Sequence, residues 1–186
     1  HRINRRQRQM CIRDSTSTFG DNEWSFPQKL GSDINLESRE THAHISPDGN
    51  TLYFISDRKK GQGGQDIYKC NKLPNGQWAK AQNLGNIINS PYDEDGIFIH
   101  PSGKTMYFSS KGHKSIGGYD IFSSEMDENG NWGAPVNLGY PVNSTDNDIF
   151  FVTSADGKRG YYSSFQEKGY GEKDIYRISL YEAEEI

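Results

Sequence analysis

Short apolar blocks alternate with polar, turn-forming blocks along this chain. In residues 46–54, "SPDGNTLYF", four turn formers stand directly before a strand-like run that ends in two aromatics. Proline and glycine favour tight turns because proline fixes φ and glycine tolerates a positive φ. Residues 96–100, 104–110, 119–126 and 132–138 also read as strands bounded by turn signals. Since no run keeps apolar residues at helical spacing, the pattern predicts an all-β protein.

This block pattern repeats every 54 residues. The run at 46–54 returns as "HPSGKTMYF" at 100–108 and, in weaker form, as "TSADGKRGYY" at 153–162. Four short strands per unit at a fixed period are typical of β-propeller blades, whereas a β-sandwich does not require matched residues. Ten residues recur 54 and 108 positions later: Trp24, Leu30, Gly31, Asn35, Gly49, Tyr53, Ser56, Gly63, Asp66 and Ile67.

The repeat predicts a partial β-propeller with about three four-stranded blades. Closed propellers have about four or more blades, so we expect an incomplete ring. The chain opens on an outer-type strand, "WSFPQKL", and ends on a third-type strand, "KDIYRISL". The predicted parts are a disordered segment (1–15), the end of a preceding blade (16–30), two blades (31–84 and 85–138), a final blade without its outer strand (139–180) and an exit linker (181–186).

The first residues stand outside the repeat. Residues 5–15, "RRQRQMCIRDS", resemble the translation of a sequencing-library adapter, and we exclude such a segment from fold reasoning. The alternative is a genuine basic arm for nucleic acid. Without residues 1–15, 16 Lys and Arg face 24 Asp and Glu, a net charge of −8. We therefore predict no nucleic-acid partner and no direct membrane insertion. Cys70 is then the one remaining cysteine, which excludes an intrachain disulfide.

The recurring residues are expected to serve packing. Aromatics on both faces of "TMYF" suit a strand that is covered by neighbouring blades on both sides. The repeated aspartates follow a glycine loop, where a carboxylate can accept backbone N–H groups. These aspartates are Asp66, Asp120 and Asp174.

Two sets of residues are candidates for binding. His42 and His44 share one face of a strand, as zinc or copper ligands can. Because His44 aligns with Phe98 and Val152 and no third ligand is evident, we predict packing, with no metal or other cofactor. The second set recurs at the start of the innermost strand. Its members are expected either to face the central channel, binding a cation or basic ligand, or to pair with backbone amides at a blade corner: Glu40, Glu94 and Asp148.

Signatures of catalysis are absent from the sequence. It has no Gly-x-Ser-x-Gly nucleophile elbow, and "GQGG" at 61–64 lacks the Lys and Ser or Thr of a phosphate loop. "SPDGNTLY" departs from the sialidase box, and "DEDG" at 93–96 lacks the downstream glutamate of a calcium loop. We therefore predict that the chain is not an enzyme and holds no catalytic residue.

The motifs "SPDGNTLYFISDR", "GGYDIF" and "W..PVNLG..VN" resemble TolB-like repeats of the Pro-Asp type over residues 24–180. The 54-residue unit is most similar to propellers of OmpA-family and type IX secretion proteins in the envelope of Bacteroidota. "SADGKRG" in the third copy lacks the proline, which suggests a terminal blade.

The resemblance implies a non-catalytic interaction scaffold with protein partners in the cell envelope, in the periplasm or at the outer membrane. Peptidoglycan would be bound only through a separate OmpA-like domain. The alternative is the propeller portion of a glycosidase or serine peptidase whose catalytic residues lie outside this sequence. Fold alone does not name the partner.

Overall fold

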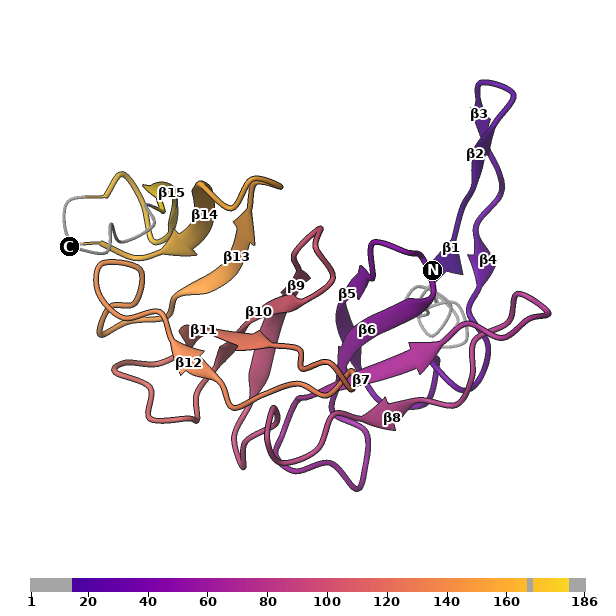
Figure 1. The fold of residues 1–186 in the computed structure, drawn as a ribbon, viewed down its shortest axis with the longest axis horizontal. Helices are drawn as coiled ribbons and strands as arrows, with labels where there is room; N and C mark the ends of the chain where they lie inside the picture. Colours follow the sequence, from indigo (N-terminus) through magenta and orange to yellow (C-terminus); the bar gives the residue numbers. More distant parts are fainter. Residues whose placement is uncertain (1–14, 167–168, 181–186) are drawn as a thin grey trace, which may run out of the picture.

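The computed structural model describes residues 15–166 and 169–180. Three antiparallel sheets follow one another along an arc, one in each repeat (Figure 1). We call residues 31–84 unit 1, residues 85–138 unit 2 and residues 139–180 unit 3. The strands of each sheet follow one another in space as they do in the sequence. The sheet of unit 1 consists of β5 (Glu40–Ile45), β6 (Thr51–Ser56), β7 (Asp66–Asn71) and β8 (Gln82–Asn83), and that of unit 2 consists of β9 (Glu94–Ile99), β10 (Thr105–Ser110), β11 (Asp120–Glu125) and β12 (Val136–Asn137). The sheet of unit 3 consists of β13 (Ile149–Thr153), β14 (Arg159–Ser164) and β15 (Asp174–Ser179).

The all-β prediction and the partial propeller are confirmed. Within residues 15–166 and 169–180 there is no helix, and hence no apolar helix of membrane-spanning length. The outer strand predicted over 132–138 is shorter than expected, because only β12 pairs with β11. Trp132 instead forms an isolated bridge with Met126. Pro135 stands directly before β12 and lacks the N–H needed to extend the pairing.

Opposite faces of each central strand pack against different neighbours. Tyr53 of β6 lies in a cluster with Phe108 of unit 2, whereas the next residue, Phe54, stacks on Tyr68 within unit 1. Tyr53 is 4% exposed and Phe54 is fully buried. The predicted two-sided burial of this strand is therefore confirmed. The same arrangement joins units 2 and 3, where Tyr107 packs on Phe151 with ring centroids 4.9 Å apart.

Each innermost strand carries an irregularity at the same repeat position. The register shifts between Thr41 and Ala43 in β5 and between Ile149 and Val152 in β13. A matching shift occurs in the β9–β10 pair. A bulge bends its strand and redirects a side chain. The bulge therefore recurs in each unit together with the strands.

The two ends of the arc lack a neighbouring unit among the described residues. The N- and C-terminal portions lie far apart at its ends (Figure 1). The predicted strand over 24–30 is divided between β3 (Glu23–Trp24), which forms a hairpin with β2 (Phe19–Gly20), and β4 (Gln28–Lys29), which pairs with β1 (Ser15–Thr16). Trp24 is 70% exposed, whereas Trp132 is 7% exposed. The predicted adapter remnant, except Ser15, and the exit linker lie outside the described residues.

Candidate functional site

The repeated aspartates organise the glycine loops, as predicted. Asp66 accepts hydrogen bonds from the backbone N–H groups of Gln62 and Gly63, at 2.5 and 3.0 Å. Its Oδ2 also accepts from Asn83 Nδ2 at 2.8 Å. Asp120 makes the equivalent contacts with Ile116, Gly117 and Asn137, and Asp174 accepts from the N–H of Tyr170.

The three recurring acidic residues at the start of the inner strands lie against serine side chains. Glu94 is fully buried and accepts from the hydroxyl groups of Ser90 and Ser110, at 2.6 and 2.8 Å. Asp148, also fully buried, accepts from the N–H and hydroxyl of Ser144. These contacts include hydrogen bonds from backbone amides at a blade corner, which is one of the two predicted roles. The other role, binding of a cation or basic ligand, stays a prediction.

Burial changes the titration of Glu94. Desolvation raises the pKa of its carboxyl group from 4.5 to about 7, although the hydrogen bonds from Ser90 and Ser110 act in the opposite direction. Its second oxygen, Oε2, has no hydrogen-bond partner in the part of the chain that the structure describes. The carboxyl group of Glu94 therefore serves mainly as a hydrogen-bond acceptor inside unit 2, although its burial disfavours the ionised form.

Glu40 has a different partner from its two counterparts. It accepts from Ser38 and Ser56 and also forms an ion pair with Arg58, with Nη2 3.2 Å from Oε1. The side chains of Arg58 and Glu40 are only 9% and 3% exposed. Unit 1 thus carries a buried charge pair at a position where unit 2 has a lone carboxylate.

The two candidate histidines make separate contacts. His42 Nδ1 lies 2.6 Å from Asp95 Oδ1, and its ring meets the edge of Phe150. His44 packs on Phe98, with ring centroids 5.1 Å apart, and desolvation lowers its pKa. Across residues 15–166 and 169–180, no cluster of three or more His, Cys, Asp or Glu side chains is placed to hold a metal ion.

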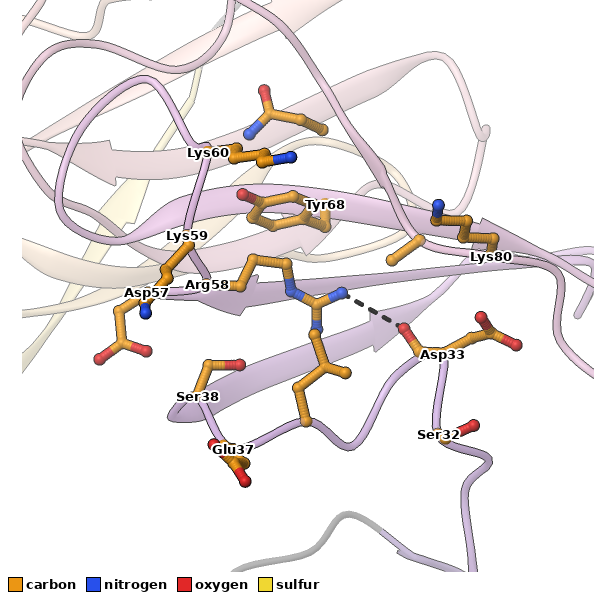
Figure 2. Close-up of a pocket in the computed structure, with 13 residues that line it drawn as sticks. Ser32, Asp33, Glu37, Ser38, Asp57, Arg58, Lys59, Lys60, Tyr68 and Lys80 are labelled. Atoms are coloured by element: carbon orange, nitrogen blue, oxygen red, sulfur yellow. Dashed lines mark hydrogen bonds between the residues drawn. The ribbon is translucent and has the colours of Figure 1, made fainter.

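A pocket of about 900 Å³ opens in unit 1 between the linker that precedes β5 and the loop that follows β6. Figure 2 shows Arg58 crossing this pocket, with its guanidinium directed at Asp33. The apolar part of the wall comes from Leu36, Tyr68 and Ala81. The remaining wall carries both signs of charge, from Asp33, Glu37, Asp57, Arg58, Lys59, Lys60 and Lys80.

Arg58 fixes the floor of this pocket. Its guanidinium carbon lies 4.8 Å from the ring centroids of both Phe54 and Tyr68. The same group donates to the carbonyl oxygens of Asp33 and Ile34, at 3.2 and 2.9 Å. One planar cation therefore joins the linker, the sheet face and the buried Glu40.

Unit 2 fills the corresponding region differently. There the ring of His113 lies against Phe108 and Phe122, and its Nε2 is 2.8 Å from the carbonyl oxygen of Ile88. Ile88 is the repeat equivalent of Ile34, so His113 takes over the carbonyl contact made by Arg58. The pocket thus lies where the units differ from one another.

Sequence reasoning missed this site because Arg58 does not recur. In the repeat, Arg58 aligns with Gly112, whereas the side chain that replaces it structurally is His113, one residue later. A signal was nevertheless present. The run "DRKK" at 57–60 interrupts the repeat with three consecutive cations, directly after a strand that otherwise matches its counterparts.

Comparison with known proteins identifies the fold. The solved structures that resemble this chain include TolB from Acinetobacter baumannii, with a TM-score of 0.55 and 15% identity over 91% of this chain and 39% of that chain. They also include a putative TolB from Agrobacterium tumefaciens, with a TM-score of 0.55 and 19% identity over 83% of this chain and 49% of that chain. A putative 6-phosphogluconolactonase from Bacteroides uniformis aligns with TM-score 0.46 and 16% identity, over 91% of this chain and 49% of that one.

The likeness to the two TolB structures establishes a TolB-like β-propeller fold. The chain spans only two fifths to one half of their length. No protein-family profile matches the sequence, and no curated protein matches it.

Proposed function

We propose that this chain is part of a non-catalytic β-propeller scaffold that binds protein partners in the bacterial cell envelope. The proposal rests on the structural role of the recurring acidic residues. Asp66, Asp120, Glu94 and Asp148 are buried and accept hydrogen bonds from groups of their own units. A catalytic carboxylate must reach a substrate, and these four are committed to the architecture instead.

The pocket in unit 1 supplies a surface suited to binding a polypeptide segment. Leu36 is 47% exposed and gives the wall an apolar element. Lys59 and Lys60 stand on the loop after β6, opposite Glu37 on the linker (Figure 2). A surface that combines apolar area with both charges suits a polypeptide segment better than a uniformly charged ligand.

The envelope assignment rests on the sequence motifs together with the TolB-like fold. Repeats of this kind resemble those of OmpA-family and type IX secretion proteins of Bacteroidota. In this proposal the scaffold lies in the periplasm or at the outer membrane, and a separate OmpA-like domain contacts peptidoglycan. The chain itself binds neither peptidoglycan nor nucleic acid.

Site-specific cross-linking tests the proposal. A photoreactive phenylalanine replaces Lys60 at the pocket, and the matched control carries it at Lys104, which lies on an exposed turn of unit 2. Expressed in a Bacteroidota envelope, the Lys60 variant should capture a discrete envelope protein that the Lys104 variant does not. Equal labelling from both positions, or none from Lys60, contradicts a protein-binding pocket.

Two further experiments would distinguish a scaffold from a hydrolase. Chromogenic esters, lactones and glycosides should not be hydrolysed by the purified chain above the blank rate. Sequencing the DNA that flanks the coding region should reveal an OmpA-like domain in the same reading frame. A Gly-x-Ser-x-Gly domain there would instead support the serine peptidase.

A further inference from the structure

The bulges of the three inner strands bring residues of all three units to one place. β5, β9 and β13 lie on the concave side of the arc (Figure 1). Within their bulges, the same repeat position is occupied by His42, Gly96 and Phe150. The ring of Phe150 in unit 3 reaches the ring of His42 in unit 1, with centroids 4.5 Å apart. Residues that are 108 positions apart in the sequence therefore touch where the three units converge.

Gly96 gives this contact the space that it needs. A Cβ on Gly96 would lie 3.0 Å from the backbone nitrogen of Phe150 and 3.4 Å from a carbon of its ring. A larger residue in unit 2 would therefore displace Phe150. Unit 2 contributes no side chain at this repeat position, and units 1 and 3 meet across it.

Phe150 holds a backbone conformation that its side chain disfavours. Its φ is 61°, close to the 58° of Gly96, in the left-handed region that favours glycine. Burial of the ring does not offset this strain, because Phe150 is 40% exposed. Strained backbone of this kind is concentrated at functional sites. A binding role therefore explains the aromatic residue better than a folding role does.

Asp95 of unit 2 fixes the orientation of His42. Nδ1 of His42 lies 2.6 Å from Oδ1 of Asp95, which also accepts from the N–H of Gly96 at 2.9 Å. Since an ionised carboxylate can only accept, Nδ1 is the donor and Nε2 presents its lone pair. The side chains of His42 and Asp95 are 42% and 21% exposed, so both are accessible.

The three side chains form an electron-rich surface, which we call the inner-strand cluster: His42, Asp95 and Phe150. Nε2 of the imidazole is an acceptor, the carboxylate carries negative charge, and the phenyl ring offers a π surface. This combination favours a planar cation with several N–H donors, which is a guanidinium group. The formal net charge of −4 on the chain also favours the approach of a basic partner.

A second cluster shows that this chain holds one of its own cations in the same way. Nζ of Lys111 lies 2.8 Å from Asp93 Oδ2 and 4.6 Å from the ring centroid of Tyr119. A carboxylate and an aromatic ring thus bind that ammonium group together. Asp95 and Phe150 offer the same two kinds of group, but within residues 15–166 and 169–180 no lysine or arginine pairs with either of them.

We propose that the inner-strand cluster binds an arginine side chain of a polypeptide partner. The guanidinium donates to Oδ2 of Asp95 and to Nε2 of His42 and lies against the ring of Phe150. One arginine then contacts all three units, and the partner reads their arrangement as well as their surface. This site is separate from the pocket of unit 1 and does not depend on what that pocket binds.

Titration of the full chain with acetyl-arginine methylamide, followed by NMR at pH 8, tests the proposal. At this pH an imidazole is ordinarily neutral. The ring signals of His42, assigned by their loss in His42→Gln, should shift at millimolar concentrations of the probe. The matched control is acetyl-citrulline methylamide, in which a neutral urea replaces the guanidinium, and it should bind at least about tenfold more weakly. Equal binding of the two probes, or no shift with either, overturns the proposal.

Two substitutions separate the local carboxylate from the overall charge. Asp95→Asn keeps the shape of the side chain but removes its charge, and should weaken arginine binding by about tenfold. Glu128→Gln removes one charge from an exposed turn of the same unit and should leave the affinity unchanged. Equal effects of both substitutions would show that only the net charge matters, and the proposed site would be wrong.

Phe150→Gly distinguishes binding from packing. The substitution places at this repeat position the residue that unit 2 has there, and it relieves the positive φ. The midpoint of thermal unfolding should therefore not fall, whereas affinity for acetyl-arginine methylamide should fall by about tenfold. Full retention of that affinity overturns the role of Phe150. Cross-linking at Lys60 reports on the pocket of unit 1 whichever result is obtained.

Discussion

Asn89 of unit 2 hydrogen-bonds to both backbone groups of Ile67 in unit 1. Its side-chain Oδ1 accepts from the N–H of Ile67 at 2.8 Å, and its Nδ2 donates to the carbonyl of Ile67 at 3.0 Å. Asn143 makes the same pair of bonds to Ile121, at 2.7 and 2.9 Å. In units 1 and 2 an amide side chain therefore takes the place of a strand residue beside the third strand and ties the sheet to the next unit.

Removing this link should destabilise the protein. Asn89→Ala leaves the buried N–H of Ile67 without an acceptor, so we expect the free energy of unfolding to fall by about 2 to 3 kcal/mol. Chemical denaturation measures the change. Asn86→Ala, at an exposed position of the same linker, should stay within about 0.5 kcal/mol of the parent. Equal effects of the two substitutions would contradict the role assigned to Asn89.

The buried carboxyl group of Glu94 should make stability depend on pH. Its pKa is raised from 4.5 to about 7 in the folded chain, so the folded state holds a proton that the unfolded state has lost between these values. Unfolding free energy therefore falls as pH rises from about 4.5 to about 7 and levels off above that range, a loss on the order of 3 kcal/mol.

Glu94→Gln tests this assignment because the neutral amide cannot ionise. Denaturation of this variant at several pH values should show a flatter profile across the same interval. Glu128→Gln, at an exposed residue, should keep the parental profile. If Glu94→Gln retained the full decline, another group would be responsible for it.

Arg58 should contribute to stability as well as to the shape of the pocket. Arg58→Ala removes two carbonyl contacts, two ring contacts and the partner of the buried Glu40. We expect a loss of about 3 kcal/mol in the free energy of unfolding, because a buried charge left unpaired is costly.

Two controls separate the charge of Arg58 from its geometry. Arg58→Lys keeps the charge but not the planar fork, and should recover less than half of the loss. Lys60→Ala changes the pocket wall at an exposed residue and should leave the midpoint of thermal unfolding unchanged. A fully stable Arg58→Ala variant would show that the guanidinium does not hold the linker.

Equivalent glycines should respond differently to the same substitution. A Cβ on Gly63 would lie 2.0 Å from the carbonyl oxygen of Tyr92, which is backbone and has little freedom to move. We expect Gly63→Ala to cost about 2 to 3 kcal/mol. At Gly171, the same repeat position in unit 3, nothing lies within 4 Å.

Gly171→Ala is therefore the matched control. Its thermal unfolding should equal that of the parent, because an added methyl group meets no neighbouring atom there. Equal destabilisation by both substitutions would contradict the difference in surrounding space between Gly63 and Gly171.

Much of the fold was predictable because the repeated residues act locally. Asp66 is recognisable from its place after a glycine loop, and it organises that loop through groups three and four residues away. The two-residue alternation of Tyr53 and Phe54 likewise predicts that both faces of β6 are covered. These features can be predicted because each depends on neighbours close in the sequence or on a contact that recurs between units.

The pocket depended on contacts that the repeat does not encode. Arg58 reaches Ile34 and Glu40, which lie 24 and 18 residues away, and no counterpart occupies its aligned position. The sequence by itself determined the period, the strand content and the structural use of the shared residues, since identical modules must bury identical faces. Only the tertiary structure decided where the modules differ, because the contacts of Arg58 and His113 follow from the path of the chain around each unit.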